Sequence, residues 1–394
     1  MNRYFRYFLR IFRIGTVSAL LFSIAPIQVV HSEYKQNFKD FSSLMAQPSC
    51  RPPDGDVTNP TFTSDGKYLV GDWPPKSIRV WNANTAEVVS TVSDTVVDYA
   101  RKFAISADHK FLITWDNPGE SILWDFVSGT KLRTLFSTPQ TNQEILTVAF
   151  APTGHLVLIS TPGGHHLWNP DLGSDSIVLA SVGEFGISSE FSPDGSLILT
   201  QSESLHELPK IRLWDVKTLK LTHTLEGINE AHFSPDGSYI LAYSVDGPVV
   251  LHAATLNLIY RLDGTPRNWR FSPHSKYLLA DEGQEAVILW DVVEGKALHK
   301  FTEKIGIPFA AFFPEEKTIL FAQDSAEEPE SKTTFSIRDI ESGRELRKFT
   351  ISPSLDAMQN LVLSPNGVYL VVASSNGILT AWDTQSGKPI HQYC

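Results

Sequence analysis

Short apolar runs separated by turn residues recur along most of this chain. A representative stretch is Phe191-Ser-Pro-Asp-Gly195-Ser-Leu-Ile-Leu-Thr200, followed by Ile211-Arg-Leu-Trp-Asp215 and Val216-Lys-Thr-Leu-Lys-Leu221. Proline sets φ at the first central position of a tight turn, and glycine supplies the positive φ at its end. The flanking runs are short and rich in β-branched and aromatic residues, which is typical of β-strands. The pattern therefore predicts a strand–turn–strand unit.

The residue that enters the first turn recurs eight times, at intervals of about 38 to 51 residues. These residues are Phe62, Phe103, Phe150, Phe191, Phe233, Phe271, Phe312 and Leu363. A second landmark is tryptophan followed by aspartate or asparagine, at Trp81-Asn82, Trp124-Asp125, Trp168-Asn169, Trp214-Asp215, Trp290-Asp291 and Trp382-Asp383, with His252 and Arg338 in its place in two units. The interval matches a four-stranded propeller blade. We predict an all-β fold, a β-propeller of eight four-stranded blades, with a seven-bladed ring as the alternative.

These landmarks resemble those of the WD-repeat family of β-propellers, over nearly all of the chain after residue 56. The chain departs from the family's pattern before the first strand, where Gly227-Ile228, for example, replaces the usual Gly-His dipeptide. The family's hydrogen-bond relay from that histidine to the tryptophan is therefore not expected in most blades. We expect the recurring tryptophans to pack between blades, and the Asp or Asn after each of them to bond turn backbone.

The N-terminal segment differs from the repeats. Four arginines precede an apolar run from Ile14 to Val30, and Glu33 is the first acidic residue. This is the pattern of a signal peptide, and an uncleaved anchor is the alternative, since the run is short for a membrane span. We predict a leader or anchor over 1–32, a linker over 33–56 and the propeller over 57–394, placed in the periplasm or outside the cell, or anchored with the propeller outside the cytoplasm.

The charge balance limits the partners. The chain carries 33 basic and 44 acidic residues, a net charge of −11. Removal of the leader would make the remainder more acidic, because its charged residues are all arginines. Nucleic-acid binding needs a basic footprint, so we expect no nucleic-acid partner. A protein partner with a basic surface fits this balance, and membrane contact is expected only through an uncleaved N-terminal segment.

The two cysteines, Cys50 and Cys394, lie near the two ends of the predicted ring. Joining the chain through them gives a repeat of about 44 residues, within the range of the other intervals. We predict a Cys50–Cys394 disulfide that closes the ring in an oxidising compartment. Two unrelated thiols are the alternative. Because the last strand comes from the C-terminus itself, we do not expect an N-terminal strand to complete the last blade.

Candidate partner-binding residues lie in the loops between second and third strands. These loops and the connections between blades share one face of a propeller, and binding residues often sit on loops held by a rigid scaffold. We predict a docking face with aromatic anchors and an acidic sector, formed by Trp73, Trp115, Asp281, Glu282, Glu285, Asp324, Glu327, Glu328 and Glu330. The alternatives are solvated acidic loops and tryptophans packed on loop prolines.

The sequence contains no arrangement that dictates a reaction. The pair His165-His166 is too few ligands for a metal site, no Gly-x-Ser-x-Gly elbow is present, and the acidic stretch from Asp324 to Glu330 lacks the alternation of a calcium loop. His232 and Arg270 lie on first strands, where the alternation leaves open whether they face the channel. We therefore expect no catalytic, cofactor or metal site, and predict a non-catalytic interaction or scaffold module. A channel-centred enzyme, lactonase-like or quinone-dependent, is the alternative.

The intact mass of the protein from its own source tests the leader and the disulfide together. We expect a mass that corresponds to about residues 33–394, lower by two hydrogens and without bound ligand. Full-length protein with two alkylatable thiols would contradict both predictions, and an additional bound mass would favour the enzyme.

Overall fold

A computed structural model describes the chain at residue 57 and over 59–73, 77–93, 102–115, 120–137, 144–170, 177–179, 185–204, 207–244, 246–262, 268–282, 286–302, 309–324, 333–351, 358–374 and 378–394. Every regular element in these ranges is a β-strand. No helix in this part of the chain is long and apolar enough to cross a bilayer.

The first half of the described chain forms four antiparallel sheets, numbered here as blades. Blade 1 consists of β1 (Thr61–Phe62), β2 (Tyr68–Trp73), β3 (Ser77–Asn82) and β4 (Val88–Ser93). Blade 2 consists of β5 (Lys102–Ile105), β6 (Phe111–Trp115), β7 (Glu120–Asp125) and β8 (Lys131–Ser137). Blade 3 consists of β9 (Thr147–Phe150), β10 (Val157–Thr161), β11 (Gly164–Trp168) and β12 (Ile177–Leu179). Blade 4 consists of β13 (Phe185–Phe191), β14 (Leu197–Glu203), β15 (Lys210–Asp215) and β16 (Leu221–Glu226).

The second half repeats this order. Blade 5 consists of β17 (Ile228–Phe233), β18 (Tyr239–Ser244), β19 (Gly247–His252) and β20 (Leu258–Arg261). Blade 6 consists of β21 (Trp269–Phe271), β22 (Tyr277–Glu282), β23 (Ala286–Asp291) and β24 (Lys296–Phe301). Blade 7 consists of β25 (Phe309–Phe312), β26 (Thr318–Asp324), β27 (Thr333–Asp339) and β28 (Glu345–Ile351). Blade 8 consists of β29 (Met358–Leu363), β30 (Tyr369–Ser374), β31 (Leu379–Asp383) and β32 (Pro389–Tyr393).

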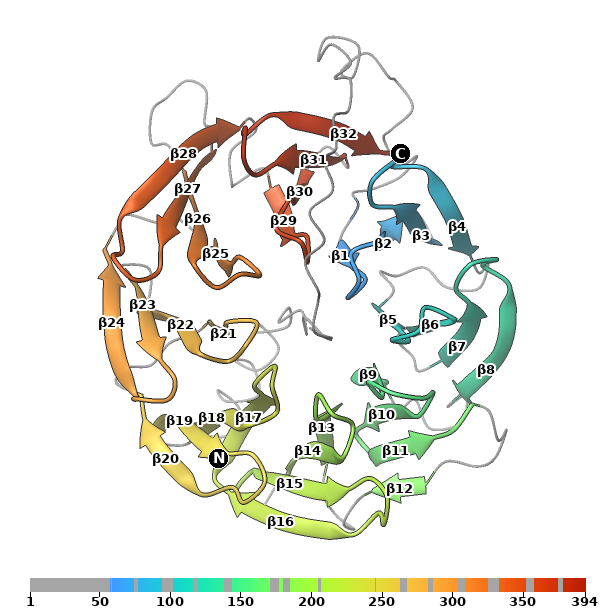
Figure 1. The fold of residues 1–394 in the computed structure, drawn as a ribbon. Helices are drawn as coiled ribbons and strands as arrows, with labels where there is room; N and C mark the ends of the chain where they lie inside the picture. Colours follow the sequence, from blue (N-terminus) through green and yellow to red (C-terminus); the bar gives the residue numbers. More distant parts are fainter. Residues whose placement is uncertain are drawn as a thin grey trace, which may run out of the picture.

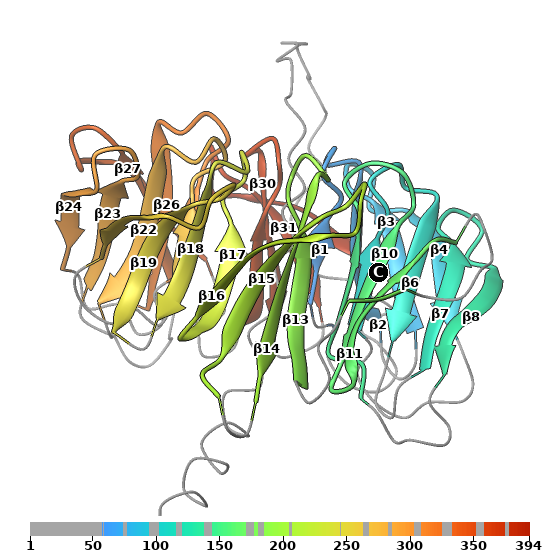
Figure 2. The same cartoon turned by 90° about the horizontal axis from the view of Figure 1, so that it is seen from below.

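The blades follow one another around a ring, with the first strand of each blade innermost and the fourth outermost (Figure 1). The strands run between the two faces of the resulting disc (Figure 2). The predicted all-β propeller of eight four-stranded blades is confirmed for the described residues, and the seven-bladed alternative is wrong. Each sheet there consists of four consecutive strands. The described part of blade 8 therefore takes all its strands from the C-terminal end of the chain, as expected.

The hydrophobic core lies between blades rather than within them. On each second strand, two consecutive apolar residues are at most 3% exposed, and they enter two different clusters, one shared with the preceding blade and one with the following blade. The pairs are Leu69/Val70, Leu112/Ile113, Val157/Leu158, Ile198/Leu199, Ile240/Leu241, Leu278/Leu279, Ile319/Leu320 and Leu370/Val371. Successive side chains on a strand point to opposite faces. This is why these strands are continuous apolar runs instead of alternating ones.

The recurring tryptophans pack against the preceding blade, as predicted. Trp124 joins the cluster between blades 1 and 2, and Trp290 joins the cluster between blades 5 and 6. In place of a histidine relay, the indole N–H of Trp124 donates to Thr114 Oγ1 at 2.9 Å, and that of Trp214 donates to Thr200 Oγ1 at 2.9 Å. A threonine of the second strand thus accepts the indole N–H in two blades.

The polar residue after five of the six tryptophans accepts hydrogen bonds from the last turn of its blade, as the second expectation requires. Asp215 Oδ1 accepts from the backbone N–H of Thr218 at 2.7 Å and from its hydroxyl at 2.6 Å. Asn82 accepts in the same way at the equivalent turn of blade 1. In blade 5, the backbone bond from His252 N to Asn257 O matches the bond from Asp215 N to Lys220 O. The assignment of His252 to the tryptophan position is therefore wrong by one residue, and Leu251 takes that place in the core.

A second set of contacts joins the outermost strands to the next blade. Early in several outer strands, a side chain donates a hydrogen bond to a carbonyl in the last turn of the following blade. Examples are Ser90 Oγ to Phe126 O at 2.7 Å, Arg133 Nη2 to Pro170 O at 2.8 Å, Tyr260 OH to Val292 O at 3.0 Å, and His299 Nε2 to Glu341 O at 2.9 Å. Arg347 contacts the carbonyl of Gln385 in the same way. In the sequence, such a contact would be indicated by a hydrogen-bond donor a few residues after the last turn of a blade. The landmarks used to find the repeats do not include this position.

The interface of blades 8 and 1, called the seam below, joins the two ends of the described chain. Val57, Trp81 and Tyr393 are fully buried there in one cluster. The indole N–H of Trp81 donates to the carbonyl of Cys394 at 3.0 Å, and the Tyr393 hydroxyl donates to the carbonyl of Ala83 at 2.8 Å. Cys50 lies outside the described residues, so the Cys50–Cys394 disulfide stays a prediction. Cys394 itself lies next to blade 1, where the prediction requires it.

Gly154 and Gly387 have similar backbone conformations but different surroundings. Substituting each of them therefore distinguishes the cost of a strained turn from the cost of a clash between blades. Gly154 has φ +71° and open space around a built Cβ, whereas Gly387 has φ +66° and a built Cβ 2.6 Å from Cβ of Phe349. We expect Gly154→Ala to cost about 1 kcal/mol of unfolding free energy from the left-handed conformation alone. Gly387→Ala should cost about 1–3 kcal/mol more, because the methyl group must displace blade 7. Urea denaturation of both variants measures the difference, and equal losses would contradict this account of the close approach.

Candidate functional site

The predicted loop tryptophans lie in the core. Trp73 is 6% exposed and belongs to the seam cluster, and Trp115 is 7% exposed in the cluster between blades 2 and 3. The guanidinium of Arg79 lies 3.8 Å from the centre of the Trp73 ring, and burial lowers the pKa of Arg79. The expectation that these tryptophans add exposed aromatic surface is therefore wrong. Each ends a second strand, where the ring completes an interface between blades.

Of the predicted acidic residues, Asp281 has a defined side-chain environment. It is 7% exposed and accepts hydrogen bonds from the backbone N–H of Asn268 at 2.9 Å and from Asn268 Nδ2 at 2.6 Å. This carboxylate therefore holds the segment that enters β21, and it is not an exposed docking charge. Glu282 and Asp324 are the last residues of β22 and β26. Their side chains, and the residues Glu285, Glu327, Glu328 and Glu330, lie outside the described part of the structure, so the acidic sector stays a prediction.

A cluster of ionisable groups lies on the innermost strands of blades 4 and 5. His232 Nδ1 is 2.9 Å from Glu190 Oε2, and His232 Nε2 is 3.3 Å from Glu230 Oε1. Glu190 also accepts from the backbone N–H of Phe233 at 2.6 Å. The imidazole therefore bridges two carboxylates, one on the preceding blade and one on its own strand. Glu190 and His232 are 42 residues apart, one repeat interval, and each precedes the landmark phenylalanine of its blade. The repeat therefore places them on equivalent positions of neighbouring blades, but it does not show that their side chains meet.

The carboxylates determine the charge of His232. Burial alone would lower the pKa of His232, but the charge and hydrogen bonds of Glu190 and Glu230 raise it to about 10. The hydrogen bond from His232 in turn lowers the pKa of Glu230, against the effect of its burial. At neutral pH the imidazole is consequently a cation that donates from both nitrogens. A histidine in this state has no lone pair with which to act as a general base or a metal ligand.

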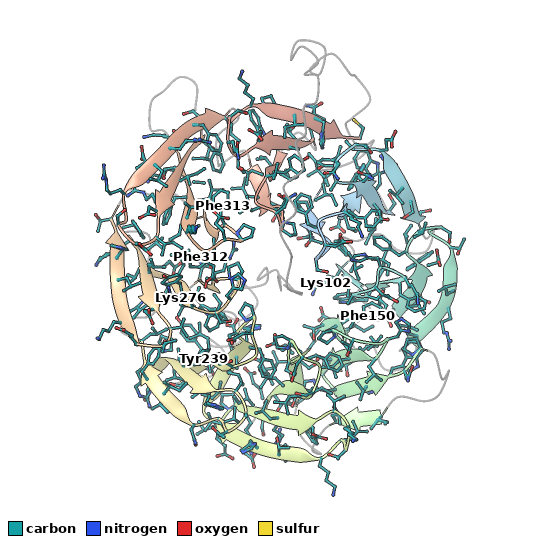
Figure 3. All side chains as sticks on the ribbon, viewed as in Figure 1. Lys102, Phe150, Tyr239, Lys276, Phe312 and Phe313 are labelled. Atoms are coloured by element: carbon teal, nitrogen blue, oxygen red, sulfur yellow. The ribbon has the colours of Figure 1, made fainter. Side chains whose placement is uncertain are left out.

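Aromatic and basic groups extend this inner surface. The Trp269 ring of blade 6 lies 5.4 Å from the His232 ring, measured between centroids. Burial lowers the pKa of Arg270, the next residue. Lys102 of blade 2 and Phe312 of blade 7 lie on innermost strands on opposite sides of the ring (Figure 3). The structure thus brings His232, on the innermost strand of blade 5, into contact with a carboxylate of blade 4, a carboxylate of its own strand and an indole of blade 6.

The paired histidines of blade 3 form part of a buried contact between blades. Ser160 Oγ lies 3.0 Å from His165 Nδ1 and 2.6 Å from Ser189 Oγ of blade 4. Burial lowers the pKa of His166. Within the described ranges, no group of three or more His, Cys, Asp or Glu side chains could hold a metal ion. His165 therefore contributes to the packing of blade 3 on blade 4 at a place where a glycine, Gly186, approaches Thr161 closely.

No protein-family model matches the chain. A curated relative, Protein tipD of Dictyostelium discoideum, is 25% identical over 250 residues, which is 60% of this chain and 40% of tipD. The chain thus spans less than half the length of that relative. The match places the repeats of this chain alongside part of a longer protein.

Solved structures are similar in fold. The β-propeller domain of Cps50 (Swd1) from Myceliophteria thermophila has a TM-score of 0.53 at 13% identity, covering 77% of this chain and 100% of that chain. The dihydro-heme d1 dehydrogenase NirN has a TM-score of 0.61 at 15% identity, covering 75% of this chain and 67% of that chain. At these identities the likeness shows the β-propeller fold alone. A propeller of this shape occurs in an enzyme as well as in the Cps50 domain.

The His232 contact predicts a pH-dependent contribution to stability. The pKa of His232 is raised on folding, so its contribution is fully present below the ordinary value near 6.5 and is lost as pH rises through about 10. We expect His232→Gln to lower the free energy of unfolding by about 1–2 kcal/mol at pH 6 to 7, and by less at pH 10. Urea denaturation at several pH values measures this.

The exposed histidine His252, also in blade 5, provides a matched control. Its ring makes no hydrogen bond or ion pair among the described residues, so His252→Gln should leave stability unchanged at each pH. A His232→Gln deficit that stays constant from pH 6 to 10 would show that packing, and not charge, accounts for the contact.

Proposed function

We propose that this chain is a WD-repeat-type β-propeller that acts as a non-catalytic scaffold, presenting loops to a protein partner. The observation that supports the proposal most directly is the contact of His232 with Glu190 and Glu230 on the innermost strands of blades 4 and 5. His232, on the innermost strand of blade 5, donates from both nitrogens to carboxylates on two blades. The contact between His232 and Glu190 joins blades 4 and 5. A ring joined in this way holds its loops in fixed positions.

The architecture supports this role in a second way. Every described interface between neighbouring blades contains an apolar cluster, and hydrogen bonds from outer strands reach the turns of the next blade. A scaffold of this kind loses little conformational entropy when a partner binds, because its backbone is already ordered. Binding loops on such a scaffold can vary without disturbing the core.

The partner is proposed to carry a basic surface. The chain has a net charge of −11, and the acidic residues of blades 6 and 7 are concentrated near the loops that follow β22 and β26. Complementary charge increases the rate of encounter and favours the correct partner. Export from the cytoplasm, with the Cys50–Cys394 disulfide formed, is part of the proposal and is supported by the N-terminal sequence pattern.

Charge reversal on opposite faces of the disc tests the docking face. We expect simultaneous substitution of Asp324, Glu327, Glu328 and Glu330 by lysine to reduce recovery of the native partner at least tenfold. Recovery is measured with the tagged full-length protein purified from its own source. Quantitative mass spectrometry of the purified complex measures this.

The matched control reverses Glu87 and Glu294, two exposed residues in the turns of the opposite face. These substitutions should leave partner recovery unchanged. Equal effects of both sets would contradict a docking site on the loop face. A metal or quinone retained by the purified protein would contradict the non-catalytic assignment itself.

A further inference from the structure

Arg79 places a positive charge at the seam. On β3, Ile78 and Val80 pack towards blade 2, whereas Trp81 packs in the seam cluster. Because successive side chains of a strand point to opposite faces, Arg79 lies on the seam side of the blade. Its side chain is partly exposed, so solvent still reaches it. A guanidinium is therefore held beside the apolar and aromatic side chains of the seam cluster.

An indole ring holds this guanidinium. Arg79 Cζ lies 3.8 Å from the centre of the Trp73 ring, well within the range of a cation–π contact. In the register of β2 and β3, Gly71 lies directly opposite Arg79, which leaves room for the longer side chain to extend over Trp73. The Trp73 ring in turn meets the Trp81 ring edge to face, with centroids 5.8 Å apart. A buried aromatic pair thus orients the arginine in advance, which reduces the entropy cost of binding.

The charge of Arg79 has no partner among the described residues. Its Nε atom is shielded from solvent and has no hydrogen-bond partner, and within the described ranges no hydrogen bond or ion pair joins the guanidinium to another group. Burial lowers the pKa of Arg79, and no carboxylate in this part of the chain opposes that effect. Buried donors in folded proteins are nearly always hydrogen-bonded. The guanidinium therefore calls for an acceptor that the described residues do not supply.

Arg133 of blade 2 shows a similar arrangement with its donor satisfied. Its guanidinium lies 5.3 Å from the centre of the Trp168 ring, and its Nη2 atom donates to the carbonyl of Pro170 at 2.8 Å. There, a neighbouring blade supplies both the aromatic ring and the acceptor. At Arg79 the aromatic ring is present and the acceptor is left to another molecule.

We propose that Arg79 and the ring of Trp73 form a binding site for an oxyanion, the carboxylate or phosphate group of a small ligand. The planar guanidinium presents paired N–H donors whose geometry matches these groups. Thr91, directly opposite Arg79 on β4, is exposed, so the site adjoins solvent at the outermost strand. A bound anion would supply the missing acceptor and the counter-charge together. The proposal does not depend on the proposed scaffold role.

Nuclear magnetic resonance of the full-length protein with isotope-labelled arginine tests the proposal. Sodium phosphate and sodium acetate are added separately, each up to about 100 mM, at an ionic strength held constant with sodium chloride, so that screening does not change. We expect a saturable shift of the Arg79 Nε–Hε signal with at least one of these anions. A response to one of them alone identifies the group that the site binds.

Urea denaturation at the same anion concentrations compares variants. A bound anion should raise the ratio of folded to unfolded protein, beyond the general effect of the salt that all variants share. Arg79→Met keeps an unbranched side chain over Trp73 without the charge, and Arg79→Lys keeps the charge without the paired donors. Each should weaken the apparent anion affinity at least tenfold. The matched control, Arg133→Met, removes the hydrogen-bonded counterpart and should retain the full affinity.

Absence of a saturable shift of the Arg79 signal with both anions would overturn the proposal. Full anion-dependent stabilisation of Arg79→Met would also overturn it, because other groups would then account for the binding. If Arg79→Met is too unstable to study, Arg79→Lys decides the question by the same comparison with Arg133→Met.

Discussion

Each blade of this protein is buried on both sides, and the rest of the structure depends on that constraint. Leu69 and Val70, adjacent on β2, enter two separate clusters, one towards blade 8 and one towards blade 2. A single blade has no core of its own, so it is stable only between two neighbours. The ring satisfies this requirement for all blades at once, because closure leaves no terminal blade with an open face. The apolar contribution to stability is consequently a property of neighbouring pairs.

Polar contacts make the same pairs specific. Serine, arginine, tyrosine and histidine side chains of outer strands donate to carbonyls of the next blade. Near the axis, Glu190 and His232 join blades 4 and 5 through a charged contact. Such contacts add modest net stability, but they leave a buried group unsatisfied if two blades shift relative to each other. Apolar packing therefore holds the ring together, and hydrogen bonds fix the relative position of its blades.

The two histidines with opposite pKa shifts illustrate how position within this scheme determines chemistry. His232 lies between two carboxylates and is a cation at neutral pH, with a pKa of about 10. His391 lies against Tyr369 and Tyr393 and is neutral, with a pKa of about 4. His232 joins blades 4 and 5, whereas the ring contacts of His391 are with tyrosines of its own blade. Two carboxylates favour the charged imidazole in the first case, and burial favours the neutral imidazole in the second.

The sequence by itself determined the repeat and the local turn chemistry, and it favoured eight blades over seven. Asp215 and its equivalents bond the turn three residues away, and such contacts depend on neighbours along the chain. The tertiary structure alone decided which side chains are exposed and which ionisable groups meet. Trp73 and Trp115 stand beside loop prolines in the sequence, yet each completes a core with a neighbouring blade. Glu190 and His232 meet across 42 residues. Contacts of this kind follow from the rotation of one blade relative to the next, which no local pattern of residues records.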